Sequence, residues 1–157
     1  MKSFFTAGAA VGLLAAASVS SSQAGTTEAC PYSAAELTAA LGFTVQGGQG
    51  SELPFPGGKM MTCEYKGNSK VGLSLSQNRS TSPADAKNVA MGFQGQAIAG
   101  DPDGAIWVAV VGDTSRISLS YVRGSTHTEI SLVGVNSKNE TEAAPLRNKL
   151  QKLRRVP

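Results

Sequence analysis

Two cysteines, Cys30 and Cys63, constrain this chain more than any other feature, because they are the only two in its 157 residues. A bond between them would close a long loop and stabilise the fold by about 3–4 kcal/mol. The alternative is a pair of free thiols. Disulfides persist in oxidising compartments outside the cytoplasm, so the choice between the two depends on whether the chain is exported.

The first 24 residues have the pattern of a secretory signal peptide. Lys2 provides the positive charge, residues 7–17 form the apolar segment, and Ser22-Gln23-Ala24 suits a small-x-small cleavage site. The apolar segment is short and rich in alanine and glycine, which argues against a transmembrane anchor. Glu28, just before the first cysteine, argues against a lipidation site. We therefore expect a periplasmic or secreted protein with no stable membrane anchor after cleavage, and a disulfide between the two cysteines.

Residues 25–157 have the length of a single domain. The whole chain has 14 basic and 11 acidic residues, and without Lys2 the balance is 13 − 11 = +2. This charge is small, and no aromatic residues are interleaved among the basic ones. The charge argues neither for nor against an anionic partner, whereas the absence of interleaved aromatics and the expected export argue against a nucleic-acid partner.

The first helix has the clearest signals. Ser33 and Glu36 form a Ser-x-x-Glu capping box, Tyr32 can pack against Leu37 as a hydrophobic staple, and Gly42 is a typical C-terminal cap. The pattern predicts a helix over residues 33–41.

Two more helices follow later in the chain. Ser82 as cap and Pro83 as first residue predict a helix that ends before Gly95. A leucine stripe predicts a last helix over about residues 143–154, with Pro145 in its first turn and basic residues over the rest of its surface.

The strands between these helices have apolar and polar residues in alternation. A hairpin is predicted over residues 60–77, and residues 106–111 are apolar enough for a central strand. Turn lengths then predict the pairing. A three-residue loop at 67–69 gives Tyr65–Val71, Cys63–Leu73 and Met61–Leu75; a Gly124-Ser125 turn gives Leu119–Ile130 and Ile117–Leu132; a Gly112-Asp113 turn gives Val108–Ile117 and Ile106–Leu119.

Together these elements predict an α+β fold, in which an antiparallel sheet of about five to six strands is flanked by three helices and carries one disulfide. The predicted pairing leaves Trp107 on a serine-rich, polar face of the sheet together with His127.

Candidate binding residues lie in two places. The Gly/Pro-rich stretch 47–58 predicts a long loop that holds Leu53 and Phe55. Phe55 either folds back onto the edge of the core or contacts a partner. Trp107 either forms a binding platform on the polar face or lies under a helix that covers this face.

His127 is the only histidine. A metal cluster usually draws on more than one Cys or His, and a serine nucleophile needs a histidine that a third group orients. We expect His127 on the surface near Glu129 and include it among the candidate binding residues. We expect no catalytic residues, no metal and no cofactor.

Short motifs run through the mature part of the chain, namely Cys30-x-x-Ser33-x-x-Glu36-Leu37, then Leu41-Gly42, then Cys63-x-Tyr65. In this arrangement the chain resembles a group of bacterial cell-envelope proteins of unknown function, many of which are lipoproteins. The resemblance implies an antiparallel sheet flanked by helices, somewhat like the PsbP-type sandwich, and a disulfide. It implies no activity. The chain departs from the group in lacking a lipobox.

These observations favour an exported, non-catalytic binding or interaction module of the bacterial envelope, with an envelope or secreted protein as its partner. One alternative is an inhibitor or immunity protein that inserts Leu53-Pro54-Phe55-Pro56 into the cleft of a cell-wall hydrolase or toxin. A second alternative is a small hydrolase that uses one of the serines with His127.

Overall fold

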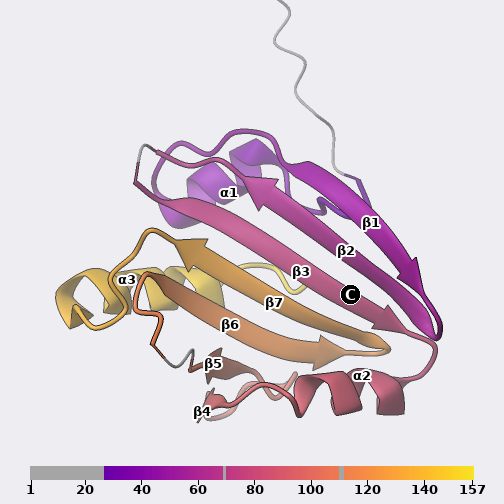
Figure 1. Cartoon of the computed structure of the whole chain (residues 1–157). Coiled ribbons are helices and arrows are strands. Elements are labelled where there is room, and N and C mark those ends of the chain that lie inside the picture. The colour runs from indigo at the N-terminus through magenta and orange to yellow at the C-terminus, as the bar shows by residue number, and fades with distance from the viewer. Residues whose placement is uncertain (1–26, 69, 110–111) are drawn as a thin grey trace, which may run out of the picture.

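The computed structural model describes residues 27–157 except 69 and 110–111, and within them it has an α+β fold (Figure 1). Seven strands form one antiparallel sheet in the order β1-β2-β3-β7-β6-β5-β4. The predicted class, with three helices and one sheet, is confirmed, but the described residues form seven strands rather than five or six. The elements are α1 Ala34–Leu41, β1 Gln49–Phe55, β2 Gly58–Tyr65, β3 Gly72–Ser80, α2 Pro83–Ala90, β4 Gly95–Ala97, β5 Ile106–Val108, β6 Arg116–Arg123, β7 Thr126–Val133 and α3 Glu140–Gln151.

The sheet is the middle of three layers. Leu37 of α1 and Leu150 of α3 are buried in one cluster with Leu75 and Ile130 of the sheet, and we call this side the core face. Figure 1 shows α1 and α3 together behind the strands. On the opposite side, which we call the outer face, α2 packs on β3, β6 and β7 through the buried Ala86. Neighbouring residues of a strand point to opposite faces, so a one-residue difference in register decides the layer of each side chain.

The first helix begins and ends as predicted. The Glu36 N–H donates to Ser33 Oγ over 3.1 Å, and Gly42 adopts a left-handed φ of 76°. The second half of the capping box does not form, because the Glu36 carboxylate accepts from Arg154 Nε at 3.0 Å instead. This ion pair joins the start of α1 to the segment after α3.

The last helix differs from its prediction. It begins at Glu140, so Pro145 lies inside it rather than in its first turn. The amides of Glu142 and Ala143 both donate to Asn139 O, which starts the helix about one turn earlier than expected. A proline inside a helix removes one backbone hydrogen bond, here the one to Thr141, which is exposed to water. By contrast, the second helix begins at Pro83 after its Ser82 cap, as predicted.

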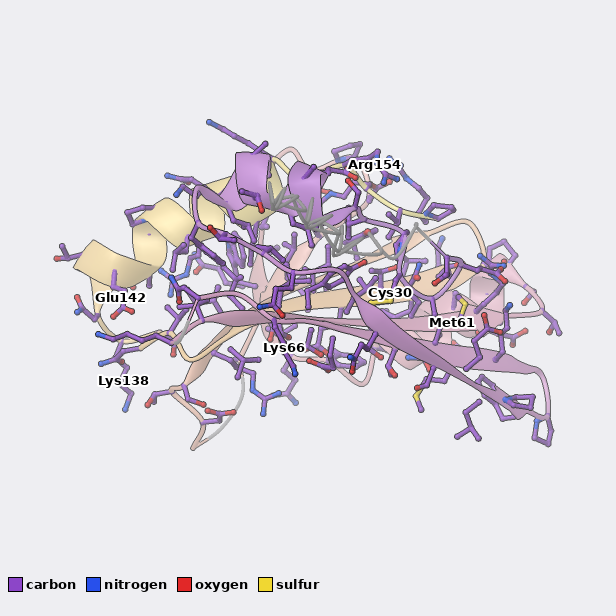
Figure 2. All side chains as sticks on the ribbon, turned by 90° about the horizontal axis from the view of Figure 1, so that it is seen from above. Cys30, Met61, Lys66, Lys138, Glu142 and Arg154 are labelled. Carbon is purple, nitrogen blue, oxygen red and sulfur yellow. A yellow bond between two sulfur atoms is a disulfide. The ribbon has the colours of Figure 1, made fainter. Side chains whose placement is uncertain are left out.

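The disulfide between Cys30 and Cys63 is present, with the two Cα atoms 5.3 Å apart. Figure 2 shows it between the segment before α1 and the sheet. Two buried tyrosines join the same two segments, since the Tyr32 N–H donates to the Tyr65 hydroxyl over 3.2 Å and their ring centroids are 6.5 Å apart. The bond therefore fixes the start of α1 against the middle of β2.

The prediction of a long loop over residues 47–58 is wrong, because Gln49–Phe55 forms the edge strand β1. Glycine permits this where a side chain would not fit, as a Cβ on Gly50 would lie 2.9 Å from Cys30 Sγ. Phe55 and Gly58 flank a two-residue turn and form a hydrogen-bonded pair across it. The backbone groups of the preceding residue, Pro54, therefore point away from β2, toward the free edge of the sheet. There its missing N–H costs no partner.

Two of the three predicted registers need correction. The β6–β7 pairs Leu119–Ile130 and Ile117–Leu132 are confirmed. In the β2–β3 hairpin Tyr65 pairs with Leu73, two residues beyond the predicted partner, because Asn68 Oδ1 accepts from the amides of Lys70 and Val71 and widens the loop. A shift of two keeps the same face, so Cys63 still points into the core.

The β5–β6 register is wrong by one residue, which turns β5 over. Trp107 pairs with Leu119 and lies on the core face, while Val108 pairs with Ser118 on the outer face. The connection is longer than a two-residue turn because Asp113 Oδ1 accepts from both the amide and the hydroxyl of Ser115. The expected central strand over 106–111 is only Ile106–Val108, second from the edge; Val110 and Val111 lie outside the described residues.

The segment after α3 is anchored in the core face. The Val156 N–H donates to the Tyr121 hydroxyl over 3.0 Å, and Gln77 Nε2 donates to Pro157 O over 2.8 Å. Arg155 pairs with the buried Asp101 at 2.7 Å. This segment completes the core beneath the middle strands.

Among the described residues, each helix is too short or too polar to traverse a lipid bilayer. The predicted signal peptide over residues 1–24 lies outside the part of the chain that the structure describes.

Gly48 gives a direct test of the packing around the disulfide. A Cβ at this position would lie 2.7 Å from Tyr65 Cε1 and 2.9 Å from Cys30 Sγ. We expect Gly48→Ala to lower the free energy of unfolding by about 1–3 kcal/mol through overpacking. The measurement is urea unfolding of the oxidised protein.

The matched control is Gly72→Ala, where the nearest atom to the new Cβ is 3.4 Å away. It should change the free energy of unfolding by less than about 1 kcal/mol. Equal effects at the two glycines would contradict the packing argument.

Candidate functional site

The four predicted binding residues do not form one site. Leu53 and His127 lie on the outer face in one row across β1, β2, β3 and β7, through Met60 and Asn78, but they are three strands apart. Three strand spacings amount to about 14 Å. Trp107 lies on the core face. Only Leu53 and Phe55, at alternate positions of β1, share a surface.

Leu53, Phe55 and their neighbour Met60 define what we call the hairpin surface. Leu53 is 59% exposed and Phe55 39%, while Met60 beside Leu53 is half-buried. The Phe55 ring folds back over Gly58, where a Cβ would lie 3.1 Å from Phe55 Cζ. The Phe55 ring therefore covers the hairpin and still presents part of its surface to solvent.

The other side of this hairpin is held by ion pairs. Lys59 Nζ lies 2.6 Å from Glu28 Oε2 and 3.3 Å from Glu52 Oε2, and Arg79 also pairs with Glu28. The hydrogen bond from Lys59, more than any other contact, lowers the pKa of Glu28. The hairpin is thus tied to the segment before α1 on its core face, and its outer face is left open.

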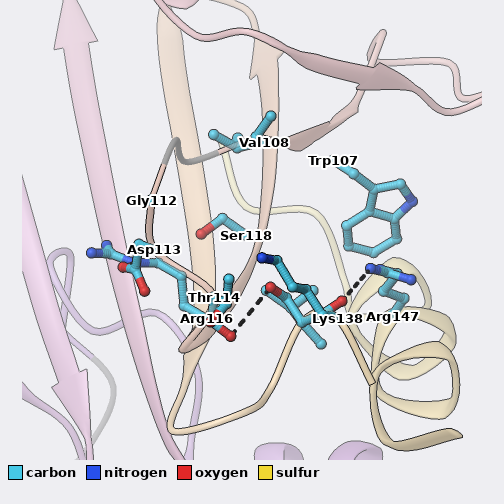
Figure 3. Close-up of a pocket in the computed structure, with 12 residues that line it drawn as sticks. Trp107, Val108, Gly112, Asp113, Thr114, Arg116, Ser118, Lys138 and Arg147 are labelled. Atoms are coloured by element: carbon cyan, nitrogen blue, oxygen red, sulfur yellow. Dashed lines mark hydrogen bonds and ion pairs between the residues drawn. The ribbon is translucent and has the colours of Figure 1, made fainter. Parts of the chain in front are cut away.

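Trp107 walls a second candidate site, a cavity of about 310 Å³ that we call the Trp107 pocket (Figure 3). It lies between β5, the start of β6, the connection before α3 and Arg147 of α3. Trp107 is half-buried and packs against the core cluster. It was predicted on the polar face, either exposed or covered by a helix, and it lies instead on the core face, opposite to α2. The residues that line the pocket include Trp107, Val108, Asp113, Arg116, Ile117, Ser137, Lys138 and Arg147.

The walls of the pocket carry three basic side chains and one carboxylate. Asp113 accepts from the amide and hydroxyl of Ser115, at 2.8 and 2.6 Å, and from Arg116 Nε at 2.6 Å. These bonds, those from Ser115 above all, lower the pKa of Asp113 to about 2. Asp113 is therefore ionised near neutral pH and already occupied by donors.

The basic groups are not all neutralised. Arg147 donates to both oxygens of Glu140 and to Ser137 O. Arg116 donates through Nε alone, so its two terminal nitrogens have no protein partner among the described residues. Lys138 makes no ion pair with any residue that the structure describes. The pocket thus keeps positive charge that the fold does not use.

His127 is buried, contrary to the expectation of a surface position. Its Nε2 lies 2.8 Å from Ser120 Oγ, and its ring is 4.5 Å from the Phe93 ring, which comes from the segment after α2. Burial lowers its pKa, while the charge of Glu129 acts in the opposite direction. The covering of this face by α2 and Phe93 explains the difference.

The Ser120–His127 contact does not form a triad. His127 Nδ1 has no hydrogen-bond partner within the described residues, so no carboxylate orients the ring. Ser120 lies in the middle of β6, between β5 and β7, where backbone amides serve the sheet ladder. Both side chains are at most 2% exposed, although Ser120 borders a hollow of about 300 Å³ under α2. The arrangement reads as a hydrogen bond within a packed layer.

Within residues 27–157, leaving aside 69 and 110–111, no three His, Cys, Asp or Glu side chains are grouped to hold a metal ion. No family model, curated protein or solved structure matches the chain. The functional argument therefore rests on the residues themselves.

The basic residues of the Trp107 pocket were not predicted as a group. Arg116, Lys138 and Arg147 come from a strand, a loop and a helix, and no sequence spacing relates them. The one available signal was the basic surface of the last helix, which is more often a solvated face.

The buried His127 should make stability depend on pH. Its folded pKa is lowered, so below its ordinary pKa of about 6.5 the unfolded chain binds a proton that the folded chain does not. The contribution of the neutral His127 to the free energy of unfolding is therefore fully present above this pH. It is lost as the pH drops through this value, by at most about 1.4 kcal/mol per pH unit. Urea unfolding at a series of pH values from about 8 to about 5 measures how the free energy of unfolding changes with pH.

The control is His127→Gln, which retains a hydrogen-bonding group near Ser120 but does not titrate. Its unfolding free energy should lose this component of the pH dependence. The same slope in both proteins would contradict the assignment.

Proposed function

We propose that the chain is an exported, non-catalytic interaction module of the bacterial envelope that contacts a partner protein through the hairpin surface. The observation that carries the proposal is the exposure of Leu53 and Phe55 on one face of an ion-paired edge hairpin. Export is supported by the signal-peptide pattern and by the disulfide, which persists in oxidising compartments.

A contact made by side chains fits this hairpin better than strand addition. Pro54 faces the free edge and cannot donate a hydrogen bond to an added strand. Phe55 is an aromatic side chain of the kind enriched at binding interfaces, and its ring is already held against Gly58. Ordering this ring on binding therefore costs little conformational entropy.

Capture experiments with Leu53→Ser and Phe55→Ser test this proposal. Mature protein carrying an N-terminal tag is immobilised, because Val156 near the other end is buried. Retained envelope proteins are identified by mass spectrometry. We expect one stoichiometric partner whose affinity falls at least about tenfold in each variant, since truncation at an interface centre costs more than about 1.4 kcal/mol.

Val133→Ser is the matched control, because Val133 is 42% exposed at the far end of β7 and away from the hairpin. It should retain the partner fully. Retention of the same proteins by Leu53→Ser and by the unaltered chain would count against the hairpin surface.

An inhibitor or immunity protein is a special case of this proposal. The turn of the hairpin, Pro56-Gly57, is exposed, and a Cβ on Gly57 would meet no atom within 4 Å. A narrow, open tip of this kind fits a cleft. Co-purification with a cell-wall hydrolase or toxin that is lost in Phe55→Ala would identify this case.

The hydrolase alternative has one specific observation in its favour, the 2.8 Å contact between Ser120 and His127. We expect no catalysis by this pair, because both side chains are buried and Nδ1 has no acidic partner. Hydrolysis of p-nitrophenyl acetate by the unaltered chain and by His127→Ala should therefore be the same. A loss of turnover in both Ser120→Ala and His127→Ala, with folding intact, would establish the alternative.

A further inference from the structure

The Trp107 pocket combines unpaired positive charge with an aromatic wall, and the hairpin proposal uses none of its residues. We propose that this pocket binds a small organic anion whose body is aromatic or aliphatic. The site is distinct from the hairpin surface, so either proposal can fail while the other holds.

The charge of the pocket selects an anion. Its lining contains three cations and one carboxylate, 3 − 1 = +2, and Glu140 outside the lining reduces this to +1 by pairing with Arg147. The Asp113 carboxylate already accepts three hydrogen bonds from the protein, so it would bind a cationic ligand only weakly. The groups left for a ligand are the terminal nitrogens of Arg116 and the Lys138 ammonium.

These donors approach from separate elements. Arg116 begins β6, and Lys138 lies in the connection that leads to α3. Figure 3 shows the Lys138 side chain on the Trp107 side of the pocket, while the Arg116 guanidinium lies beside Asp113, farther from the indole. The connection is held in place, since Ser137 N donates to Thr114 O over 2.8 Å. A compact charged group such as a carboxylate or phosphate suits either donor, because charge-assisted hydrogen bonds to it are strong.

The apolar part of the lining selects the rest of the ligand. Trp107, Val108 and Ile117 supply an aromatic and aliphatic wall beside the basic groups. The volume of about 310 Å³ is at the lower end of the range for small-molecule sites, about 300–1,000 Å³. A short acid or phosphate ester with an apolar body matches this combination of size, charge and surface.

The chain contains a single tryptophan, so its fluorescence reports on this pocket alone. The full chain, expressed for export and purified in its oxidised form, is titrated with benzoate, phenyl phosphate and the neutral benzamide. We expect a saturable change in fluorescence with one or both anions and none with benzamide at the same concentrations. The tighter of the two anions identifies the charged group as a carboxylate or a phosphate.

Charge-removing variants locate the binding. Lys138→Gln and Arg116→Gln should each raise the Kd of the preferred anion about fivefold or more, since hydrogen bonds to charged groups are being lost. Lys152→Gln, an exposed lysine at the opposite end of α3 from Lys138, should leave the Kd unchanged. Leu53→Ser should also leave it unchanged, which separates this site from the hairpin surface. Thermal unfolding confirms that each variant is folded.

Three results would overturn the proposal. They are binding of benzamide as tight as that of the preferred anion, the absence of a saturable change with either anion, and an equal loss of affinity in Lys152→Gln and Lys138→Gln.

Discussion

The joint around the disulfide is the contact on which the rest of this structure depends. The Cys30–Cys63 bond holds the start of α1 against β2, and the hydrogen bond between Tyr32 and Tyr65 aligns the same two segments. Glycines 48 and 50 allow β1 to pass close to the sulfur atoms. Without this joint neither the helix that covers the core face nor the edge strand that presents the hairpin surface would have a fixed position.

Local signals predicted the first two helices well, while the start of the last helix and the lengths of two connections differed from prediction. The caps Ser33 and Ser82 act within one turn of chain, so their effect can be read from neighbouring residues. The Gly124-Ser125 turn was right because it is minimal. In the other two turns Asn68 and Asp113 accept from amides two or three residues ahead and build wider loops. A short side chain that bonds its own backbone thus changed the register, and at β5 it reversed the face of every residue.

The candidate sites were only partly predictable for a related reason. Leu53 and Phe55 stand out in the sequence as apolar residues among glycine and proline, but a glycine-rich edge strand looks like a loop until the disulfide beneath it is known. His127 was placed on the correct face of the sheet, yet its burial depends on Phe93, which is distant in sequence. The positive charge beside Trp107 arises only when a strand, a loop and a helix meet.

The anchoring of residues 154–157 has a consequence for how the protein matures. These residues follow all seven strands in the chain, yet Tyr121 and Gln77 in the middle of the sheet bond to them. The central layer therefore reaches its final packing only after every strand has been synthesised and, if the chain is exported, translocated. The two cysteines emerge much earlier, so oxidation can precede this last step and restrict the partly folded chain while it waits for its remaining segment.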